Sequence, residues 1–441
     1  MALITNINAR WILDSRGLPT IQCELTLDNQ GKKSTGTASV PSGASTGSYE
    51  ALELRDNSSN FHGKGVDRAI NNINTNILNH VINREFSSAD EIDKTILQLD
   101  KSTNKSELGA NSVLAVSMAA HRAFAESVGV ELWQYLRRLY FSQLPATNQF
   151  PRLMCNLLNG GAHASNGLSI QEFMIIPNTE TIESDIQSAS EIYHNLKIAL
   201  KNDNYSTSLG DEGGFAPKFN LENIIKSQSE DTEETNIIEL NPTKVALKYL
   251  IEACEKSNYP KCQLAMDCAA NEFLEKNEEN KEIYKIDGTE MSRSELAQFY
   301  NQLSEEFPII SIEDGFAEDD ILGWEILTEI LGKKINLIGD DLFVTNPNRF
   351  KKIGLHNNIA NGVLIKLNQI GSVLETCQMI NLAKENNYIT AVSHRSGETT
   401  DSFISDLAFA AQSEFIKLGA PARGERVAKY NRLLEIKDNI Q

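Results

Sequence analysis

Three acidic residues close short apolar segments in the C-terminal half of this chain, and together they could hold a metal ion. Asp267 ends QLAMD, Glu313 ends IISIE, and Asp340 follows INLIG. Carboxylates that meet at close range repel one another, so a protein keeps them ionised only by supplying a cation. Oxygen ligands of this kind suit a hard ion such as Mg²⁺. The pattern predicts a magnesium site, provided that the fold brings the three residues together.

A lysine inside an apolar segment indicates acid–base chemistry. Lys366 lies in the middle of VLIKLNQIG, and burying an ammonium group without a partner is costly. A nearby divalent cation and the second ammonium of Lys417, which ends SEFIK, both disfavour the protonated form. We expect the pKa of Lys366 to fall from about 10.4 towards neutral, which would make it a usable general base. The alternative is a lysine neutralised by a neighbouring carboxylate in the core.

The segment SHRSGET, residues 393–399, gathers His394, Arg395 and Ser396 at one predicted strand end. Arg395 can hold a phosphate or carboxylate with two parallel hydrogen bonds, and Ser396 can donate a third. The segment is therefore a candidate anion-binding site, with an ordinary polar loop as the alternative.

Two further stretches are polar loops rich in glycine. NGGAHASNGLSIQEFMIIP holds His163 in the loop and Gln171 and Glu172 on the following strand, and SLGDEGGFAP sets Asp211 and Glu212 before two glycines. A carboxylate flanked by glycines can reach a ligand with little steric hindrance. Either stretch alone is a weak signal, because most such acids are turn residues.

The apolar segments recur at a regular interval, which predicts how their charged ends are positioned. After Glu313 the segment ends follow at intervals of 27, 26, 28 and 23 residues, with helix-like stretches between them. A repeated strand–helix unit of about 25 residues is typical of a parallel (β/α) barrel. The carboxyl ends of barrel strands face one mouth, so we expect these charged residues to converge there.

The N-terminal part differs in style. Residues 10–43 indicate short strands separated by turns, and residues 109–129 indicate a helix with a terminal glycine, which together favour an α+β domain. We place a boundary between residues 145 and 146, so that the second domain spans 146–441. An acidic insert at about 220–240 interrupts the barrel pattern, and Asn241–Pro242 restarts a helix after it.

Composition excludes several classes of function. The chain has 441 residues and a formal charge of −19, which argues against nucleic-acid binding because that needs a basic surface. The first residues lack the features of a signal peptide, and we find no stretch apolar enough to cross a membrane. The six cysteines form no C-x-x-C pair, so we interpret them as small buried residues in a reducing compartment. We expect a cytoplasmic enzyme.

Taken in order, the motifs of this chain resemble those of the enolases, the phosphopyruvate hydratases of glycolysis and gluconeogenesis. The similarity runs from the first predicted strand almost to the C-terminus. It is carried by LDSRGLPT, VPSGASTG, NGGAHA, QEFMI, GDEGGFAP, SIEDGF, GDDLFVTN, IKLNQIG, SHRSGET and IKLGAPARGERVAKYN. The resemblance implies an α/β protein with a small α+β N-terminal domain, a three-stranded sheet plus helices, followed by a modified TIM-type (β/α)8 barrel whose second strand runs antiparallel.

The resemblance also implies roles for individual residues. Lys366 matches the base that removes the C2 proton of 2-phospho-D-glycerate, and Glu212 matches the acid that helps hydroxide leave C3. Two Mg²⁺ ions per site are implied: a structural one held by Asp267, Glu313 and Asp340, and a substrate-dependent one joined by Ser45 of a lid loop. The positions matching substrate contacts are Gln171, His163, Glu172, Glu313, Asp340, His394, Arg395, Ser396 and Lys417.

Assembly and location are implied in the same way. Enolases form homodimers or higher assemblies of dimers, act on a small phosphorylated substrate in the cytoplasm, and neither bind nucleic acid nor insert into membranes. The resemblance leaves room for a secondary cell-surface or secreted pool.

Three other interpretations remain open at this point. Another member of the same superfamily could dehydrate or racemise an unphosphorylated acid, although such relatives do not usually carry VPSGASTG or SHRSG. A purely structural or receptor role would leave the intact acids and Lys366 unexplained. A two-carboxylate glycosidase on a barrel has no need for Lys366.

Overall fold

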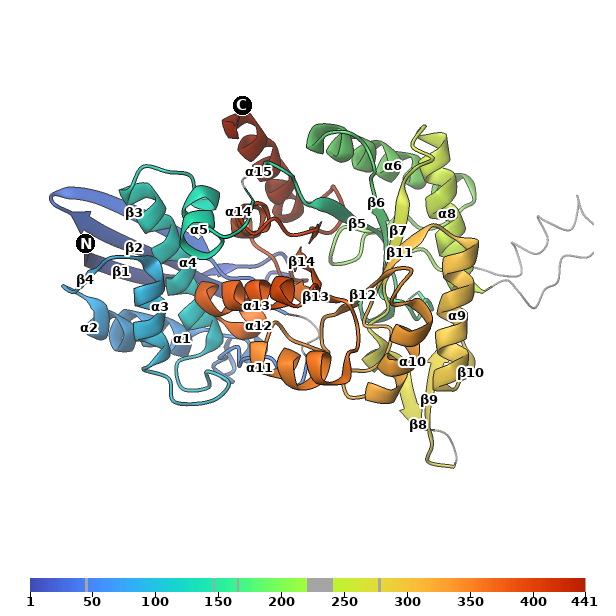
Figure 1. Ribbon diagram of the computed structural model, residues 1–441, viewed down its shortest axis with the longest axis horizontal. Coiled ribbons are helices and arrows are strands. Elements are labelled where there is room, and N and C mark those ends of the chain that lie inside the picture. The colour runs from blue at the N-terminus through green and yellow to red at the C-terminus, as the bar shows by residue number, and fades with distance from the viewer. Residues whose placement is uncertain (44–46, 146, 165, 220–240, 277–278, 441) are drawn as a thin grey trace, which may run out of the picture.

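The computed structural model describes residues 1–43, 47–145, 147–164, 166–219, 241–276 and 279–440. It contains a small sheet domain beside a closed barrel (Figure 1). The predicted acidic insert and Ser45 both lie outside these described residues. The predicted boundary between residues 145 and 146 falls between α5 and β5 and stays a prediction.

The N-terminal sheet has four strands in the order β3-β2-β1-β4. The three predicted strands are present, and the short β4 is added where it pairs with the start of β1. The strands are β1 (Ala2–Leu13), β2 (Pro19–Asn29), β3 (Lys32–Ser39) and β4 (Glu85–Phe86). All pairings are antiparallel, and β1–β2 and β2–β3 are joined by short turns, as is usual for antiparallel neighbours.

Helix α4 (Ala110–Ser127) packs on this sheet and confirms the helix predicted over residues 109–129. Gly109 and Gly129, which flank it, both have positive φ, a conformation that glycine adopts without strain. At Gly36 of β3 an added Cβ would lie 2.0 Å from the carbonyl oxygen of Ala119, so the strand can approach the helix this closely only with glycine. The other helices of this domain are α1 (Asp67–Asn71), α2 (Leu78–Val81), α3 (Ala89–Leu97) and α5 (Leu132–Tyr140).

Eight strands close the predicted barrel in the order β11-β12-β13-β14-β15-β5-β6-β7. They are β5 (Arg152–Asn159), β6 (Glu172–Ile176), β7 (Gln263–Asp267), β11 (Ile309–Glu313), β12 (Asn336–Gly339), β13 (Gly362–Ile365), β14 (Ile389–Ser393) and β15 (Phe415–Lys417). Neighbours pair in parallel except on both sides of β6, which is antiparallel to β5 and β7. The second barrel strand is therefore reversed, as the resemblance implied.

Apolar side chains fill the inside of the barrel, as is usual for a barrel of this size. Met154, Met174, Ala265, Leu364 and Phe415 belong to one buried cluster contributed by different strands. All six cysteines are free and buried. Within the described residues, no helix has both the length and the apolar character needed to span a membrane.

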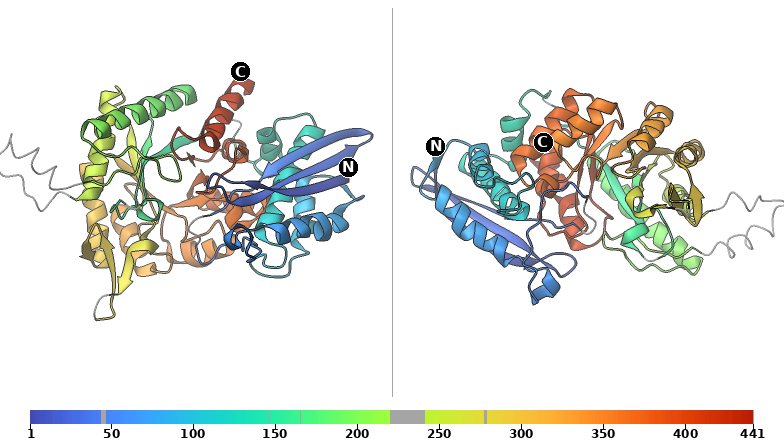
Figure 2. Two further views of the ribbon diagram at one scale, coloured as in Figure 1. Left: turned by 180° about the vertical axis from the view of Figure 1, so that it is seen from behind. Right: turned by 90° about the horizontal axis from the view of Figure 1, so that it is seen from below.

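Helices surround the barrel, and a small three-stranded sheet lies beyond it (Figures 1 and 2). The helices are α6 (Ile182–Asn202), α8 (Pro242–Lys256), α9 (Arg293–Glu306), α10 (Ile321–Leu331), α11 (Pro347–Arg349), α12 (Leu367–Ile370), α13 (Val373–Glu385), α14 (Phe403–Ala410) and α15 (Gly424–Ile440). The extra sheet consists of β8 (Leu274–Lys276), β9 (Glu282–Ile286) and β10 (Thr289–Met291). Helix α8 begins as predicted, with Asn241 accepting a hydrogen bond from the amide of Lys244 and Pro242 in the first turn.

Charged and capping contacts join the two domains. Arg122 of α4 donates two hydrogen bonds, of 2.5 and 2.7 Å, to the carboxylate of Asp401 in the loop after β14. Asp93 of α3 accepts the amide of Leu374 at the start of α13 at 3.0 Å. These contacts hold the N-terminal domain against the barrel side that carries α13 and α14 (Figure 2).

Candidate active site

The barrel mouth brings the predicted site residues together. One cavity at the carboxyl ends of the strands is lined by His163, Gln171, Glu172, Glu212, Asp267, Asp340, Lys366, His394, Arg395, Ser396 and Lys417. Glu313 lies directly beside it, because it contacts Lys417. Glu172 can join this mouth because β6 is reversed, so that its first residue pairs with Asp267, the last residue of β7.

Lys417 stands at the centre of the acidic residues. Its ammonium nitrogen donates to Asp267 Oδ2 at 2.8 Å and to both Glu313 oxygens at 3.0 Å, and it lies 3.2 Å from Glu172 Oε1. All four side chains are buried. Burial acts to lower the pKa of Lys417, but Asp267 and the two glutamates raise it well above its ordinary value. The ammonium therefore supplies part of the positive charge that the carboxylates need.

Lys366 pairs with a carboxylate. It caps the short helix α12, and its ammonium is hydrogen-bonded to Asp340 Oδ2. Burial acts to lower the pKa of Lys366, but the carboxylates of Asp340 and Glu313 together outweigh it and the pKa is raised. The expected fall towards neutral depended on a divalent cation beside Lys366 and stays a prediction.

The three predicted metal ligands are divided between two groups of acids. Asp267 and Glu313 meet at Lys417. Among the described residues, Asp340, Asp314 and Asp341 each have a carboxylate oxygen within 4.8 Å of the other two. Asp267 and Glu313 do not belong to this group. Asp314 anchors this second group by accepting the amides of Asp340 and Asp341 at 2.9 and 2.8 Å.

The donor set fits a hard divalent cation. Burial and then Asp267 raise the pKa of Glu313 well above its usual value, and burial and Asp340 raise the pKa of Asp341 to about 7. Raised pKa values of this kind mean that the nearby positive charge does not balance the charge of the carboxylates. Oε1 of Gln171 and Oε2 of Glu172 are buried and make no hydrogen bond within the described residues, so oxygen acceptors remain for an ion.

Glu172 and Glu212 form an acid pair with two histidines around them. Glu212 lies in a turn that is held by Asn156, whose amide donates to Glu212 Oε2 at 3.1 Å. His163 Nδ1 lies 3.9 Å from Glu212 and 4.0 Å from Glu172. Nε2 of His394 faces Glu212 Oε2 at 3.5 Å.

The tautomer of His394 follows from its other nitrogen. Arg426 donates to His394 Nδ1 at 2.6 Å, so Nδ1 is the acceptor and Nε2 carries the hydrogen that points at Glu212. Burial lowers the pKa of His394 to about 3, so the ring is neutral at pH 7. His394 therefore presents an N–H dipole to Glu212 rather than a full charge.

The pKa values of the two glutamates are shifted in opposite directions. Burial acts to raise the pKa of Glu212, but His394 and His163 outweigh it, and the pKa of Glu212 is lowered well below its usual value. Burial and the charge of Glu212 raise the pKa of Glu172 well above its usual value. Of the two, Glu172 therefore favours its protonated form.

The predicted anion-binding residues follow β14. Ser396 Oγ lies 3.3 Å from both His163 Nε2 and Glu212 Oε1. The guanidinium of Arg395 is buried. The backbone of Arg395 is fixed by two hydrogen bonds, one from its amide to Glu398 and one from Arg426 to its carbonyl. The anion-binding groups and the acid pair therefore share one cavity.

Sequence reasoning missed four residues that touch this network: Asp314, Asp341, Arg426 and Glu50. A signal existed for the first two, because each directly follows a predicted metal ligand in the chain. Arg426 lies in a motif that carried the resemblance and Glu50 follows another by three residues, but nothing in their spacing relates them to His394 or Arg395.

The fold and the site together define a barrel enzyme with buried acid–base groups and an anion-binding corner. Comparison with known proteins matches both domains to one family. Residues 4–136 match the enolase N-terminal domain, and residues 147–233 and 232–441 match the enolase C-terminal TIM barrel domain. The chain belongs to the enolase family, which implies a metal cofactor and a small-molecule substrate.

Curated relatives match over nearly their whole length. The chain is 43% identical over 441 residues to the enolase of Elusimicrobium minutum, covering 100% of this chain and 97% of that protein. It is 44% identical over 442 residues to the enolase of Corynebacterium kroppenstedtii, covering 99% of this chain and 96% of that protein.

Proposed function

We propose that this chain carries out the enolase reaction, the reversible dehydration of 2-phospho-D-glycerate to phosphoenolpyruvate and water in glycolysis and gluconeogenesis. It is a hydro-lyase, a phosphopyruvate hydratase. The observation that carries the proposal is the presence of Lys366, the Glu172–Glu212 pair and Arg395 around one cavity, in a chain that matches enolases along its full length.

Lys366 and Glu212 act in sequence. Lys366 takes the proton from C2 of the substrate, and to do so its ammonium must first give up its own proton against the pull of Asp340. Glu212 then delivers a proton to the hydroxide that leaves C3, since hydroxide is a poor leaving group without a proton donor. Glu172, whose pKa is raised by burial and by the charge of Glu212, holds that proton in reserve.

The remaining residues bind and orient the substrate. Arg395 and Ser396 hold the phosphate with charge-assisted hydrogen bonds. The residues that contact the other groups of the substrate are His163, Gln171, His394 and Lys417. Orienting the C2–H bond towards Lys366 and the C3 hydroxyl towards Glu212 accounts for much of the expected rate enhancement.

Two Mg²⁺ ions per site complete the proposal. Asp267, Glu313 and Asp340 would hold the first, and Ser45 would join the second when substrate is present. The bound ions supply positive charge that stabilises the extra negative charge of the carboxylate after the C2 proton is removed.

The direct test is the appearance of the conjugated product. Purified protein with Mg²⁺ and 2-phospho-D-glycerate should produce the ultraviolet absorbance of phosphoenolpyruvate, and chelation of the metal should abolish it. D-glycerate, which lacks the phosphate, is the matched control substrate. Turnover of D-glycerate alone would favour another reaction of the superfamily and contradict the proposal.

We further propose a cytoplasmic homodimer or a higher assembly of dimers. Sedimentation equilibrium should then give a mass of at least twice the 49.0 kDa of one chain. A monomer across the micromolar range would contradict this part of the proposal.

A further inference from the structure

Residues 48–50 of the N-terminal domain are attached to the barrel by consecutive side chains. Ser48 Oγ donates to Glu318 Oε1 at 2.6 Å. The hydroxyl of Tyr49 donates to the carboxylate of Asp319 at 3.1 Å, and its ring lies 3.6 Å below the guanidinium of Arg349. Residue 50, the next in the chain, is a glutamate with a largely buried side chain that contacts Arg395.

Glu50 binds the guanidinium of Arg395 with both carboxylate oxygens. Arg395 donates from Nη1 to Glu50 Oε2 at 3.0 Å and from Nη2 to Glu50 Oε1 at 3.1 Å. Nη1 also donates to Asn368 Oδ1 at 3.0 Å. The side chains of Arg395 and Glu50 are only 3% and 8% exposed, so the ion pair is screened little by water.

The same carboxylate joins two further parts of the site. Oε1 of Glu50 accepts the amide of Gly47 at 3.1 Å, which ties the pair to its own segment. It also accepts from Gln369 Nε2 at 3.4 Å, and Gln369 donates to Asp340 Oδ1 at 2.8 Å. Glu50 is thus linked through Gln369 to Asp340, a proposed metal ligand. It also contacts Arg395, the proposed phosphate ligand, directly.

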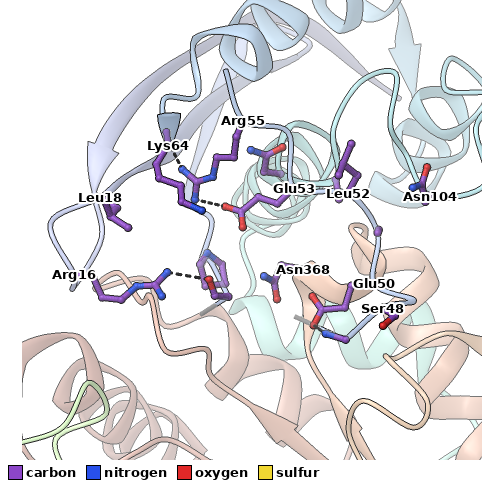
Figure 3. Close-up of a pocket in the computed structure, with 16 residues that line it drawn as sticks. Arg16, Leu18, Ser48, Glu50, Leu52, Glu53, Arg55, Lys64, Asn104 and Asn368 are labelled. Carbon is purple, nitrogen blue, oxygen red and sulfur yellow. Dashed lines mark hydrogen bonds and ion pairs between the residues drawn. The ribbon is translucent and has the colours of Figure 1, made fainter. Parts of the chain in front are cut away.

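Glu50 approaches Arg395 from outside the site cavity. A separate cavity of about 500 Å³ lies between the N-terminal domain and the barrel, and Glu50 and Asn368 line its barrel side (Figure 3). Arg395 lines the site cavity and not this one, whereas Glu50 lines this one and not the site cavity. Arg395 thus borders the site cavity, and its carboxylate partner borders the other cavity.

We propose that Glu50 is a positioning residue for phosphate recognition. It fixes the orientation of the Arg395 guanidinium from the N-terminal domain and thereby sets the affinity of the site for a phosphorylated substrate. The inference rests on the proposed function, because that is where Arg395 is assigned to the phosphate. Because the guanidinium of Arg395 is already held by a carboxylate and by Asn368, the side chain loses little further freedom when the phosphate binds.

The opposite role would be a competitor that occupies Arg395 until phosphate displaces it. The separation of the two cavities favours positioning, because phosphate in the site cavity meets Arg395 from the other side. The two roles predict opposite changes in phosphate affinity when the carboxylate is removed.

The experiment compares Glu50→Gln with Glu53→Gln in the full-length protein. Glutamine keeps the size of Glu50 but loses its charge and one of its two acceptor oxygens. The KM for 2-phospho-D-glycerate and the inhibition constant of inorganic phosphate should both rise roughly tenfold or more, since a hydrogen bond to a charged group is worth that factor. The kcat should change by less than about threefold, because Glu50 does not touch the reacting atoms.

Glu53 is the matched control. It lies on the same segment and lines the same outer cavity, but its carboxylate pairs with Arg55 at 2.5 Å within the N-terminal domain (Figure 3). Glu53→Gln should leave both constants within about twofold of the parent. Glu50→Asp keeps the charge on a shorter side chain and should restore part of the phosphate affinity.

The outcomes separate the inference from the function on which it rests. No turnover of 2-phospho-D-glycerate by the parent protein would refute the proposed function, and phosphate binding measured by calorimetry would still compare Glu50→Gln with the parent. Turnover by the parent together with unchanged or tighter phosphate binding in Glu50→Gln would overturn the positioning role. A loss confined to kcat, or a melting temperature lowered with phosphate affinity intact, would overturn it as well.

Discussion

Lys366 can act as a base only after its ammonium loses a proton beside Asp340, and this makes its removal the most direct test at the residue scale. Lys366→Ala should reduce exchange of the substrate C2 proton with solvent deuterium by about 100-fold or more, the contribution of a positioned general base. Substrate binding should stay measurable, since Arg395 and Ser396 are intact. Proton NMR of 2-phospho-D-glycerate in D₂O follows the exchange.

The control for this variant is Lys352→Ala, which removes an exposed lysine outside the site and should exchange normally. Exchange at the parent rate in Lys366→Ala would mean that another residue is the base.

Glu212 should be needed for the second step and not for the first. Glu212→Gln should lower formation of phosphoenolpyruvate by about 100-fold, because a glutamine cannot deliver a proton to the leaving hydroxide. Exchange of the C2 proton should continue, since Lys366 is unchanged. The ratio of the two rates, measured in one NMR experiment, checks the assignment, and an equal loss of both rates would argue against separate roles.

At the scale of elements, Asp93 joins α3 and α4 to the start of α13. Its Oδ2 accepts from Ser117 Oγ at 2.8 Å and from the amide of Leu374 at 3.0 Å, while Oδ1 is buried without a partner among the described residues. Burial raises the pKa of Asp93 to about 7. This junction between the two domains therefore contains an acid that the folded state prefers to keep protonated.

The sign of the pH effect follows from that shift. Between the unfolded pKa of about 3.9 and the folded pKa near 7, the folded state binds more protons, so stability falls as the pH rises through this range. Asp93→Asn removes the titration. Its stability relative to the parent protein should improve from pH 4 to pH 8 by on the order of 4 kcal/mol, as calorimetric melting at each pH would measure.

Asp90→Asn on the same helix is the control with the opposite slope. Hydrogen bonds from Lys94 and Ser88 outweigh burial, which acts to raise the pKa of Asp90, and the pKa is lowered. Its contribution to stability is present above the unfolded pKa and is lost as the pH falls. A parent-minus-variant difference for Asp93→Asn that is flat with pH would contradict the raised pKa.

At the scale of the whole molecule, the ion pair of Arg122 with Asp401 joins the two domains. Asp401→Asn should lower the free energy of unfolding by about 2 kcal/mol, because it leaves a largely buried guanidinium without its charged partner. Catalysis should be retained at temperatures where the variant is folded, since neither residue lines the site. Calorimetry together with an activity assay at 25 °C would test both expectations, and Glu290→Gln, at an exposed position, supplies the control.

A stability unchanged in Asp401→Asn would mean that apolar packing alone joins the domains. Two separated melting transitions in the variant would show that this pair couples the unfolding of the domains.

Much of the framework could be predicted from sequence for a simple physical reason. Asp267, Glu313 and Lys417 are the last residues of barrel strands, and Asp340 and Lys366 follow theirs directly. Parallel strands with a regular strand–helix interval must present those ends at one mouth. The regular interval of strand-like segments thus predicted both the barrel and the charged residues that meet at its mouth.

The states of those residues depended on distances that periodicity does not contain. Lys366 is paired with Asp340, the pKa of Glu172 is raised by burial and by Glu212, and Glu50 reaches Arg395 from 345 positions away in the chain. Electrostatic interactions between buried groups change strongly over a few ångströms. The chain by itself therefore determined which chemical groups assemble, whereas the tertiary structure alone decided which partner each group has and where the protons lie.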